Sequence, residues 1–170
     1  RLSLERKAKV IIWDINTEST ESTLKELSPL GNISSYVVDV SDLQEIEKTA
    51  EQLKKKHGNI DILINNAGIV VGKYFHKHSA TEIEKTFSIN SSAPMHICNQ
   101  FLSDMMGGNA GHICNIASSA SLVSNPKMSV YAASKWAIFS WSDSLRLEMK
   151  QLQKDIKVTT ILPYYINTGM

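Results

Sequence analysis

The sequence has few cysteines and little excess charge. Among its 170 residues only Cys98 and Cys114 are cysteines, and both lie in apolar segments without the spacing of a metal site. We interpret them as two buried structural thiols in a reducing cytosol, and we therefore expect a cytoplasmic protein. The formal net charge of +1 gives no strong attraction to nucleic acid or to an anionic membrane, so neither is expected as a partner.

Long apolar runs are also absent. None approaches the roughly 20 residues that a membrane-spanning helix needs, so no membrane segment is expected in these residues. No signal peptide is seen, although Arg1 is not a natural start and leaves an upstream targeting segment open. The sequence contains no internal repeat or linker, and its 5 histidines show no ligand-like pairing, so we predict one domain over residues 1–170 without a metal site.

Short apolar segments alternate with amphipathic ones along the chain. The predicted strands are 10–13, 36–40, 60–64, 112–116 and 157–162. The predicted helices are 17–28, a segment that begins with a capping box at Ser41–Gln44 and stops at Gly58, 79–106 in two pieces around Asn90 and Pro94, and 129–152. Continuous apolar runs are typical of strands buried on both faces. The pattern predicts an α/β fold, a doubly wound parallel sheet with helices on both faces.

Acidic residues end the first two predicted strands, where open parallel sheets bind ligands. Asp14 could accept hydrogen bonds from both hydroxyls of an adenosine ribose and would repel a 2′-phosphate, which favours NAD over NADP. Asp14 is equally well suited to cap a turn or the next helix. Asp39 could hold an adenine amino group while Val40 packs against the ring, but an Asp at a strand end is common.

The third predicted strand leads into Asn65-Asn66-Ala67-Gly68. Small residues let the backbone run close to a flat ligand, and Asn amides can fix the neighbouring backbone. A turn without a ligand uses the same residues, so the segment taken alone predicts a ligand-binding site and an ordinary turn equally well.

Tyr131 and Lys135 are spaced to share one face of a helix, and Ser118 ends a neighbouring strand. A free phenol has a pKa of about 10 and is a poor base at neutral pH. An ammonium about 4 Å away contributes roughly 4 kcal/mol at an effective dielectric of about 20, which lowers such a pKa by about three units. Tyr131 could then exchange a proton with an alcohol or carbonyl whose oxygen Ser118 also binds. Taken alone, such a spacing usually indicates only a half-buried tyrosine beside a solvated lysine.

Four motifs together resemble the short-chain dehydrogenase/reductase family. They are Asn65-Asn66-Ala67-Gly68, Phe87-Ser88-Ile89-Asn90, Asn115-Ile116-Ala117-Ser118 and Tyr131-x-x-x-Lys135, in the family's order and spacing over about residues 10 to 170. The resemblance implies a Rossmann-type fold with Tyr131 as general acid/base, Ser118 as substrate-orienting residue and Lys135 as a ligand of the nicotinamide ribose. It also implies that Asn90 holds a water that extends a proton relay through Lys135.

The segments 13–16 and 163–170 are similar to the branch with 17-beta-hydroxysteroid and retinol dehydrogenases and their bacterial relatives. This similarity implies that Ile166 contacts the nicotinamide and that Thr168 contacts the cofactor's amide or phosphates. The steroid and retinoid members usually carry an N-terminal hydrophobic anchor, which this sequence does not show. In the family, the helices at about 92–106 and 130–152 form a dimer contact, so a homodimer or homotetramer is expected, with Trp136, Phe139 and Trp141 available to it.

Two parts of the family pattern are not among these residues. The first strand with its Gly-rich turn would precede Arg1, and the substrate-covering segment would follow Met170. We expect both to belong to the protein. If the turn were absent, NAD affinity should be badly weakened. The sequence therefore predicts an NAD(H)-dependent oxidoreductase acting on an alcohol or carbonyl substrate. A binding or scaffold protein of the same fold and an isomerase or dehydratase are the alternatives.

Overall fold

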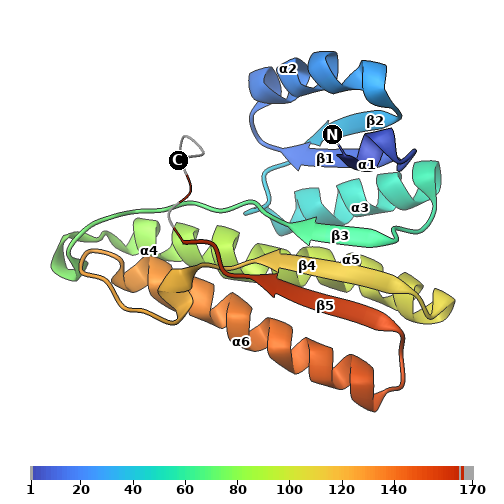
Figure 1. Cartoon of the computed structure of the whole chain (residues 1–170). Helices are drawn as coiled ribbons and strands as arrows, with labels where there is room; N and C mark the ends of the chain where they lie inside the picture. Colours follow the sequence, from blue (N-terminus) through green and yellow to red (C-terminus); the bar gives the residue numbers. More distant parts are fainter. Residues whose placement is uncertain (1, 165, 167–170) are drawn as a thin grey trace.

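The computed structural model describes residues 2–164 and 166, and in these its strands form two parallel sheets. One sheet pairs β1 (Val10–Asp14) with β2 (Ile33–Val37), and the other has the order β3 (Ile62–Asn65), β4 (Gly111–Ile116), β5 (Ile156–Ile161). The register places Asp14 opposite Val37 and Asn65 opposite Asn115. The carboxyl ends of paired strands therefore lie side by side (Figure 1).

Helices connect the strands and cover them. They are α1 (Leu2–Glu5), α2 (Thr17–Leu27), α3 (Leu43–His57), α4 (Ala80–Phe87), α5 (Ala93–Gly108) and α6 (Ser129–Gln151). A π-helical turn, Ser88–Ser92, joins α4 to α5, and short 3-10 turns lie at Ser28–Leu30, Phe75–Lys77 and Ser119–Ser121. The predicted α/β class, with parallel strands flanked by helices, is confirmed. No helix in the described part of the chain is long and apolar enough to span a bilayer.

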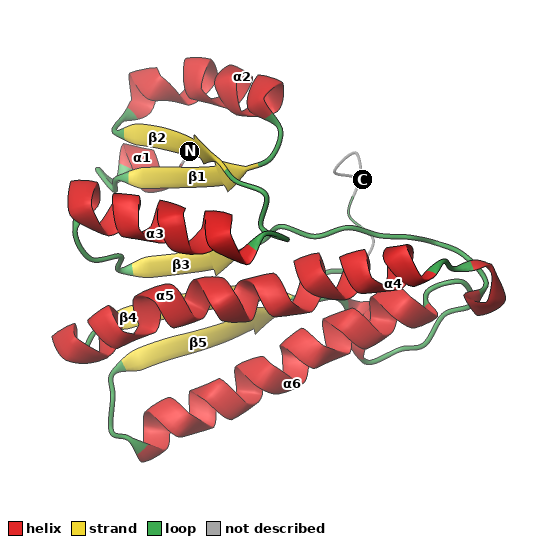
Figure 2. Ribbon diagram, turned by 180° about the vertical axis from the view of Figure 1, so that it is seen from behind, coloured by secondary structure: helices red, strands yellow, loops and turns green. Residues whose placement is uncertain are grey.

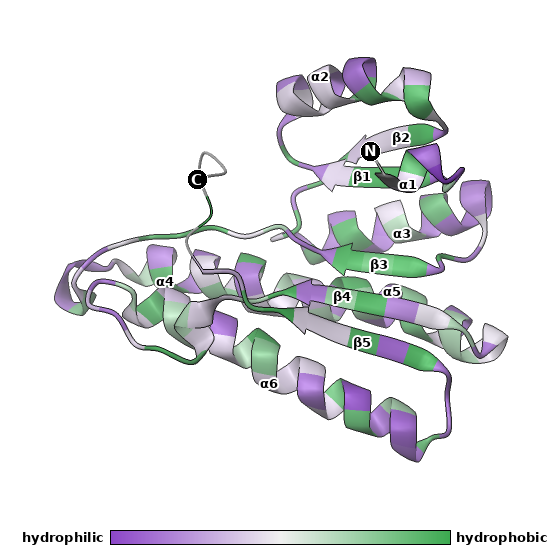
Figure 3. Cartoon of the chain, in the orientation of Figure 1, coloured by the Kyte–Doolittle hydropathy of each residue, from purple (hydrophilic) through white to green (hydrophobic). Residues whose placement is uncertain are grey.

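The core lies between β3–β5 and the helices α3, α5 and α6, which Figure 2 shows in front of the strands. Ile46 and Ala50 from α3 meet Phe101 from α5 there, with Ile113 of β4 beneath them. The helices show mixed hydrophobic and hydrophilic colouring along their length, and β3 is largely hydrophobic, whereas β4 and β5 carry both kinds of residue (Figure 3). In α3, α5 and α6 the apolar side chains of Ile46, Phe101 and Leu145 pack into the core beside the sheet.

The burial of β3 differs from the expected continuous pattern. Leu63 faces the helices, but Ile62 and Ile64 are each 61% exposed on the opposite face. Because side chains alternate along a strand, a continuous apolar run in β3 supplies both a covered face and an exposed one. The predicted limits of the second strand and the predicted start of the helix that follows it also differ from the structure.

The second strand begins at Ile33 and ends at Val37, earlier than the predicted 36–40. Its register with β1 ends at Asp14, and Asp39 already belongs to a turn closed by its own side chain. The cap of α3 is Asp42 rather than Ser41, because the Asp42 carboxylate accepts hydrogen bonds from the backbone N–H groups of Gln44 and Glu45.

Candidate active site

A series of buried side-chain hydrogen bonds connects the carboxyl ends of β3 and β4 to the middle of α6. The Asn65 amide donates to Asn115 Oδ1 over 2.7 Å, and the Asn115 amide donates to Ser142 Oγ over 2.8 Å. Ser142 in turn donates to the Ile138 carbonyl of its own helix. Because each of these groups is buried and has a partner, the chain fixes α6 against the sheet.

Lys135 lies deep in the fold, one turn of α6 beyond Tyr131. It is only 5% exposed, and its ammonium donates to the Ile116 carbonyl at the end of β4 over 2.8 Å. A Cβ atom on Gly68 would lie 3.3 Å from Lys135 Nζ and 3.3 Å from Asn90 Oδ1. Gly68, Asn90 and Lys135 thus converge, and a side chain larger than hydrogen at position 68 would crowd the other two.

Burial lowers the pKa of Lys135 to about 8. The side chain is therefore mostly a cation at neutral pH. Lys135 Nζ lies 6.0 Å from the centre of the Tyr131 ring, and Tyr131 itself is half-buried. Lys135 therefore presents a positive charge beside the Tyr131 ring below about pH 8.

Asn90 lies in the π-helical turn, and its side chain is fully used. Its Oδ1 accepts from the Ile69 N–H over 2.8 Å, while its Nδ2 donates to the Ile69 carbonyl over 2.9 Å and to Ser134 Oγ over 3.1 Å. Isolated π-helical turns often occur at functional sites because they re-aim one side chain of a helix. Here the re-aimed side chain fastens the segment after Gly68.

Ser118 begins the turn that follows β4. Its hydroxyl accepts from the Ala120 N–H over 3.1 Å. The next residue, Ser119, donates its N–H to the Pro163 carbonyl over 2.9 Å, so the segment after β5 starts beside Ser118. Within that segment Ile166 is 64% exposed, and Thr168 lies outside the described residues.

The two carboxylates predicted to contact adenosine each accept local turn bonds through one oxygen, Oδ1. Asp14 Oδ1 accepts from the Asn16 N–H over 2.8 Å, as the turn-capping alternative requires. Asp39 Oδ1 accepts from both the hydroxyl and the N–H of Ser41, which lowers the pKa of Asp39. Val40 packs partly against the core. Asn66 and Ala67, next to Gly68, are exposed at the same edge of the sheet.

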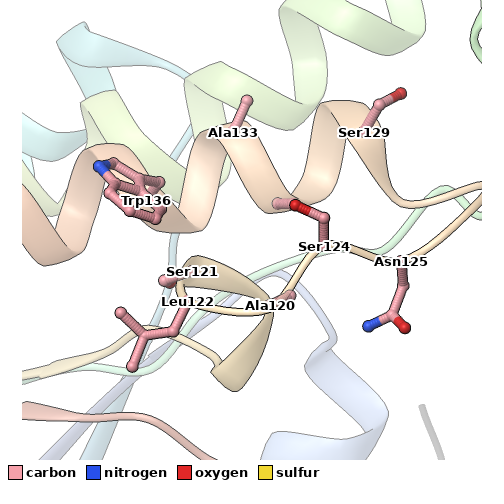
Figure 4. A pocket seen from close by; sticks show the side chains of 9 residues that line it. Ala120, Ser121, Leu122, Ser124, Asn125, Ser129, Ala133 and Trp136 are labelled. Atoms are coloured by element: carbon pink, nitrogen blue, oxygen red, sulfur yellow. The ribbon is translucent and has the colours of Figure 1, made fainter.

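A pocket of about 390 Å³ lies between α6 and the loop after Ser118 (Figure 4). Its lining residues are Ala120, Ser121, Leu122, Ser124, Asn125, Ser129, Ala132, Ala133 and Trp136. Tyr131 and Lys135 are not among them, since helical spacing puts them on another face of α6. No group of three or more potential metal ligands occurs among the described residues.

Sequence reasoning missed the buried hydroxyls of Ser91 and Ser134 beside Asn90. It also missed the buried hydroxyl of Ser142, which joins α6 to β4 two turns away from Lys135. One signal was available in the helical spacing of α6. Ser134, Ile138, Ser142, Leu145 and Met149 recur every three to four residues and are all buried. Small polar residues in such a stripe need hydrogen-bond partners inside the protein.

Known proteins match both the sequence and the fold. The family model described as short chain dehydrogenase matches residues 1–170. The chain is 38% identical over 164 residues to human epidermal retinol dehydrogenase 2, covering 95% of this chain and 53% of that protein. It is 36% identical over 165 residues to human estradiol 17-beta-dehydrogenase 11, covering 96% of this chain and 55% of that protein. The chain thus spans about half the length of these curated relatives.

Solved structures of known nucleotide complexes share the fold. NAD+-bound xylitol dehydrogenase superposes with a TM-score of 0.89 at 26% identity, over 97% of this chain and 64% of that one. The closed form of serine dehydrogenase complexed with NADP+ superposes with a TM-score of 0.87 at 29% identity, over 96% of this chain and 65% of that one. With the family motifs gathered at the strand ends and the family model matched throughout, the chain belongs to the short-chain dehydrogenase family.

Proposed function

We propose that the protein is an NAD(H)-dependent oxidoreductase that transfers a hydride between the nicotinamide and an alcohol or carbonyl carbon. The observation that carries this proposal is the buried Lys135 ammonium, held between Gly68 and the end of β4 one helical turn from Tyr131. Burial of a lysine opposes its charged form, and such sites are enriched in functional residues.

The residues at the strand ends suit a nicotinamide and its ribose. Gly68 leaves room beside Lys135, whose remaining ammonium hydrogens can donate to ribose hydroxyls. When bound, the nicotinamide supplies or accepts the hydride. For reduction, the Tyr131 hydroxyl gives its proton to the carbonyl oxygen as the hydride reaches the carbonyl carbon, which forms the alcohol. In the opposite direction Tyr131 takes the hydroxyl proton.

Ser118 orients the substrate in this proposal. Its hydroxyl uses a lone pair for the Ala120 N–H and keeps its hydrogen available for the substrate oxygen. Asn90 supports the site because its side chain binds the Ile69 backbone and so fixes the segment after Gly68. A donor already in position for the developing charge requires little rearrangement during the reaction.

Asp14 supports NAD rather than NADP as the cofactor. Its carboxylate lies at the end of β1, next to the end of β2, where a 2′-phosphate would meet a negative charge. Related structures occur with each nucleotide, so the preference rests on Asp14 alone.

We further propose an apolar alcohol or ketone as the substrate. Relatives are named for retinol and estradiol, which are both apolar alcohols. The loops before and after the site carry exposed apolar side chains, with Val70 at 44%, Leu122 at 57% and Val123 at 61%. Such side chains would lose contact with water when an apolar substrate binds.

The test is NADH oxidation by the intact protein with a panel of ketones, diketones and aldehydes, repeated with NADPH. Tyr131→Phe should lower kcat by about 10²-fold or more, because the acid/base is lost. Tyr36→Phe makes the same change at a residue of β2 whose hydroxyl pairs with His57 rather than with Lys135, and it should leave kcat unchanged. Unaltered turnover in Tyr131→Phe would sink the mechanism, and a higher kcat/KM with NADPH would overturn the role of Asp14.

A further inference from the structure

Two buried serine hydroxyls join the π-helical turn to the first turns of α6. Ser134 is completely buried, and its hydroxyl donates to the Tyr131 carbonyl over 2.7 Å while accepting from Asn90 Nδ2 over 3.1 Å. The Ser91 hydroxyl donates to the Ser134 carbonyl over 3.0 Å. Both contacts fall on the five-residue stretch of α6 that runs from Tyr131 to Lys135.

These bonds continue through Asn90 to the segment after Gly68. Asn90 binds both backbone groups of Ile69 and then Ser134, and Ser134 binds the Tyr131 backbone. Each hydroxyl and amide in this path has its partners and is shielded from water. A buried network that is fully satisfied allows few alternative arrangements, so it acts as a rigid joint.

The joint has a specific mechanical effect on α6. A serine that donates to a carbonyl of the preceding turn often bends its helix, and the Ser134 hydroxyl makes such a bond to the Tyr131 carbonyl. Asn90 holds the same hydroxyl from the neighbouring element. The orientation of the Tyr131 and Lys135 side chains relative to the segment after Gly68 therefore depends on these hydrogen bonds, and not on α6 alone.

We infer that Ser134 is a positioning residue that aligns Tyr131 and Lys135 with the cofactor-facing segment after Gly68, with Ser91 supporting it. This inference rests on the proposed oxidoreductase function for its activity readout. In this arrangement Ser134 touches neither the substrate nor the cofactor, and it acts only through Tyr131 and Lys135.

Ser142 provides a matched control on the same helix. It is also buried, donates to the carbonyl of Ile138 one turn earlier and accepts from an asparagine amide, that of Asn115. It lies two turns beyond Lys135, and its partner belongs to β4 rather than to the π-helical turn. Ser134→Ala and Ser142→Ala thus remove equivalent bonds at different places.

The experiment measures kcat, KM and the pH profile of turnover for both variants of the intact protein. Ser134→Ala should lower kcat by about 10- to 100-fold with KM changed less than about threefold, because misplacement by about 1 Å has such effects. The pH profile of turnover should shift as well, since the Lys135 ammonium would change its place relative to Gly68 and the end of β4. Ser142→Ala should leave both quantities as in the wild type. Equal kcat and equal pH profiles for the two variants would overturn the inference.

A second readout separates this inference from the proposed function. In protein labelled with ¹⁵N-lysine, the Lys135 ammonium resonance, assigned by its loss in Lys135→Arg, should titrate near the pKa of about 8. Ser134→Ala should shift this titration or the resonance itself, and Ser142→Ala should not, whether or not any substrate is turned over. If Ser134→Ala does not fold, Ser91→Ala, which removes one bond of the same joint, takes its place. Absence of turnover in the wild type defeats the proposed function, whereas an unmoved Lys135 resonance defeats the inference.

Discussion

Lys135 is a buried base on a helix face that otherwise carries small and apolar side chains. Its pKa is about 8 in the folded protein and 10.5 for an ordinary lysine, with burial as the cause. Between these two values the unfolded chain binds more protons than the folded one, so stability rises with pH across this range. Below about pH 8 both states are charged, and the burial penalty is fully present.

We predict that this penalty appears as a pH-dependent difference between the wild type and Lys135→Met. The 2.5-unit gap between 10.5 and about 8 corresponds to about 3 kcal/mol of unfolding free energy. Relative to Lys135→Met, the wild type should therefore gain stability as the pH rises from 7 toward 10.5. Urea denaturation at a series of pH values measures this difference. A constant difference between the two proteins would show that Lys135 is not desolvated.

Single residues also show where sequence reasoning reaches its limit. Asp14 ends β1 as predicted, whereas Asp39 lies in a turn beyond the end of β2, and both carboxylates accept hydrogen bonds from the adjacent backbone. A carboxylate can serve a turn or a ligand, and its position in the sequence is the same in both cases. Their cofactor roles, like the catalytic roles of Ser118 and Tyr131, stay predictions.

At the scale of elements, α4 begins with a complete capping box. Ser79 Oγ accepts from the Glu82 N–H, and the Glu82 carboxylate accepts from the Ser79 N–H and pairs with Lys73. These contacts lower the pKa of Glu82 to about 2, with the Lys73 bond as the main cause. Because α4 leads directly into the π-helical turn, its start helps to place Asn90.

We predict that Ser79→Ala lowers the free energy of unfolding by about 1 kcal/mol, the usual effect of losing such a cap. Ser103→Ala makes the same change at an exposed position inside α5, where alanine favours the helix, and should raise the free energy of unfolding by no more than about 0.5 kcal/mol. Chemical denaturation of both variants provides the comparison. Equal stability of Ser79→Ala and the wild type would mean that the cap does not stabilise α4.

At the scale of the whole molecule, α6 leaves large apolar side chains uncovered. Trp136 is 53% exposed and Leu147 is 51% exposed, whereas Trp141 packs partly against the core and is less available than the sequence indicated. We propose that this surface contributes to a homodimer or homotetramer. Cytoplasmic location likewise stays a prediction.

Trp136→Arg should shift the protein toward the monomer in light scattering coupled to size-exclusion chromatography. A buried arginine without a partner is costly, so an interface that contains residue 136 would weaken. Leu43→Arg, at a 42% exposed position on α3, is the control and should keep the wild-type mass. A wild type that is monomeric at all concentrations, or a Trp136→Arg variant of unchanged mass, would contradict the proposed interface.

The sequence by itself determined the fold class, the family and most element positions. Periodicity and capping residues act over a few neighbouring positions, and the spacing from Ser118 to Tyr131 and Lys135 is fixed along the chain. The limits of β2 were not determined, because they depend on pairing with β1 rather than on local composition.

The tertiary structure decided which polar residues share partners. Asn90 with Ser134, and Asn115 with Ser142, are 44 and 27 residues apart in the chain and meet only after the sheet and α6 pack together. It also decided that Lys135 is buried at the end of β4, which no local pattern around a lysine reveals. Hydrogen bonds and burial at this distance depend on the folded arrangement of several elements, and a single sequence gives no direct measure of that arrangement.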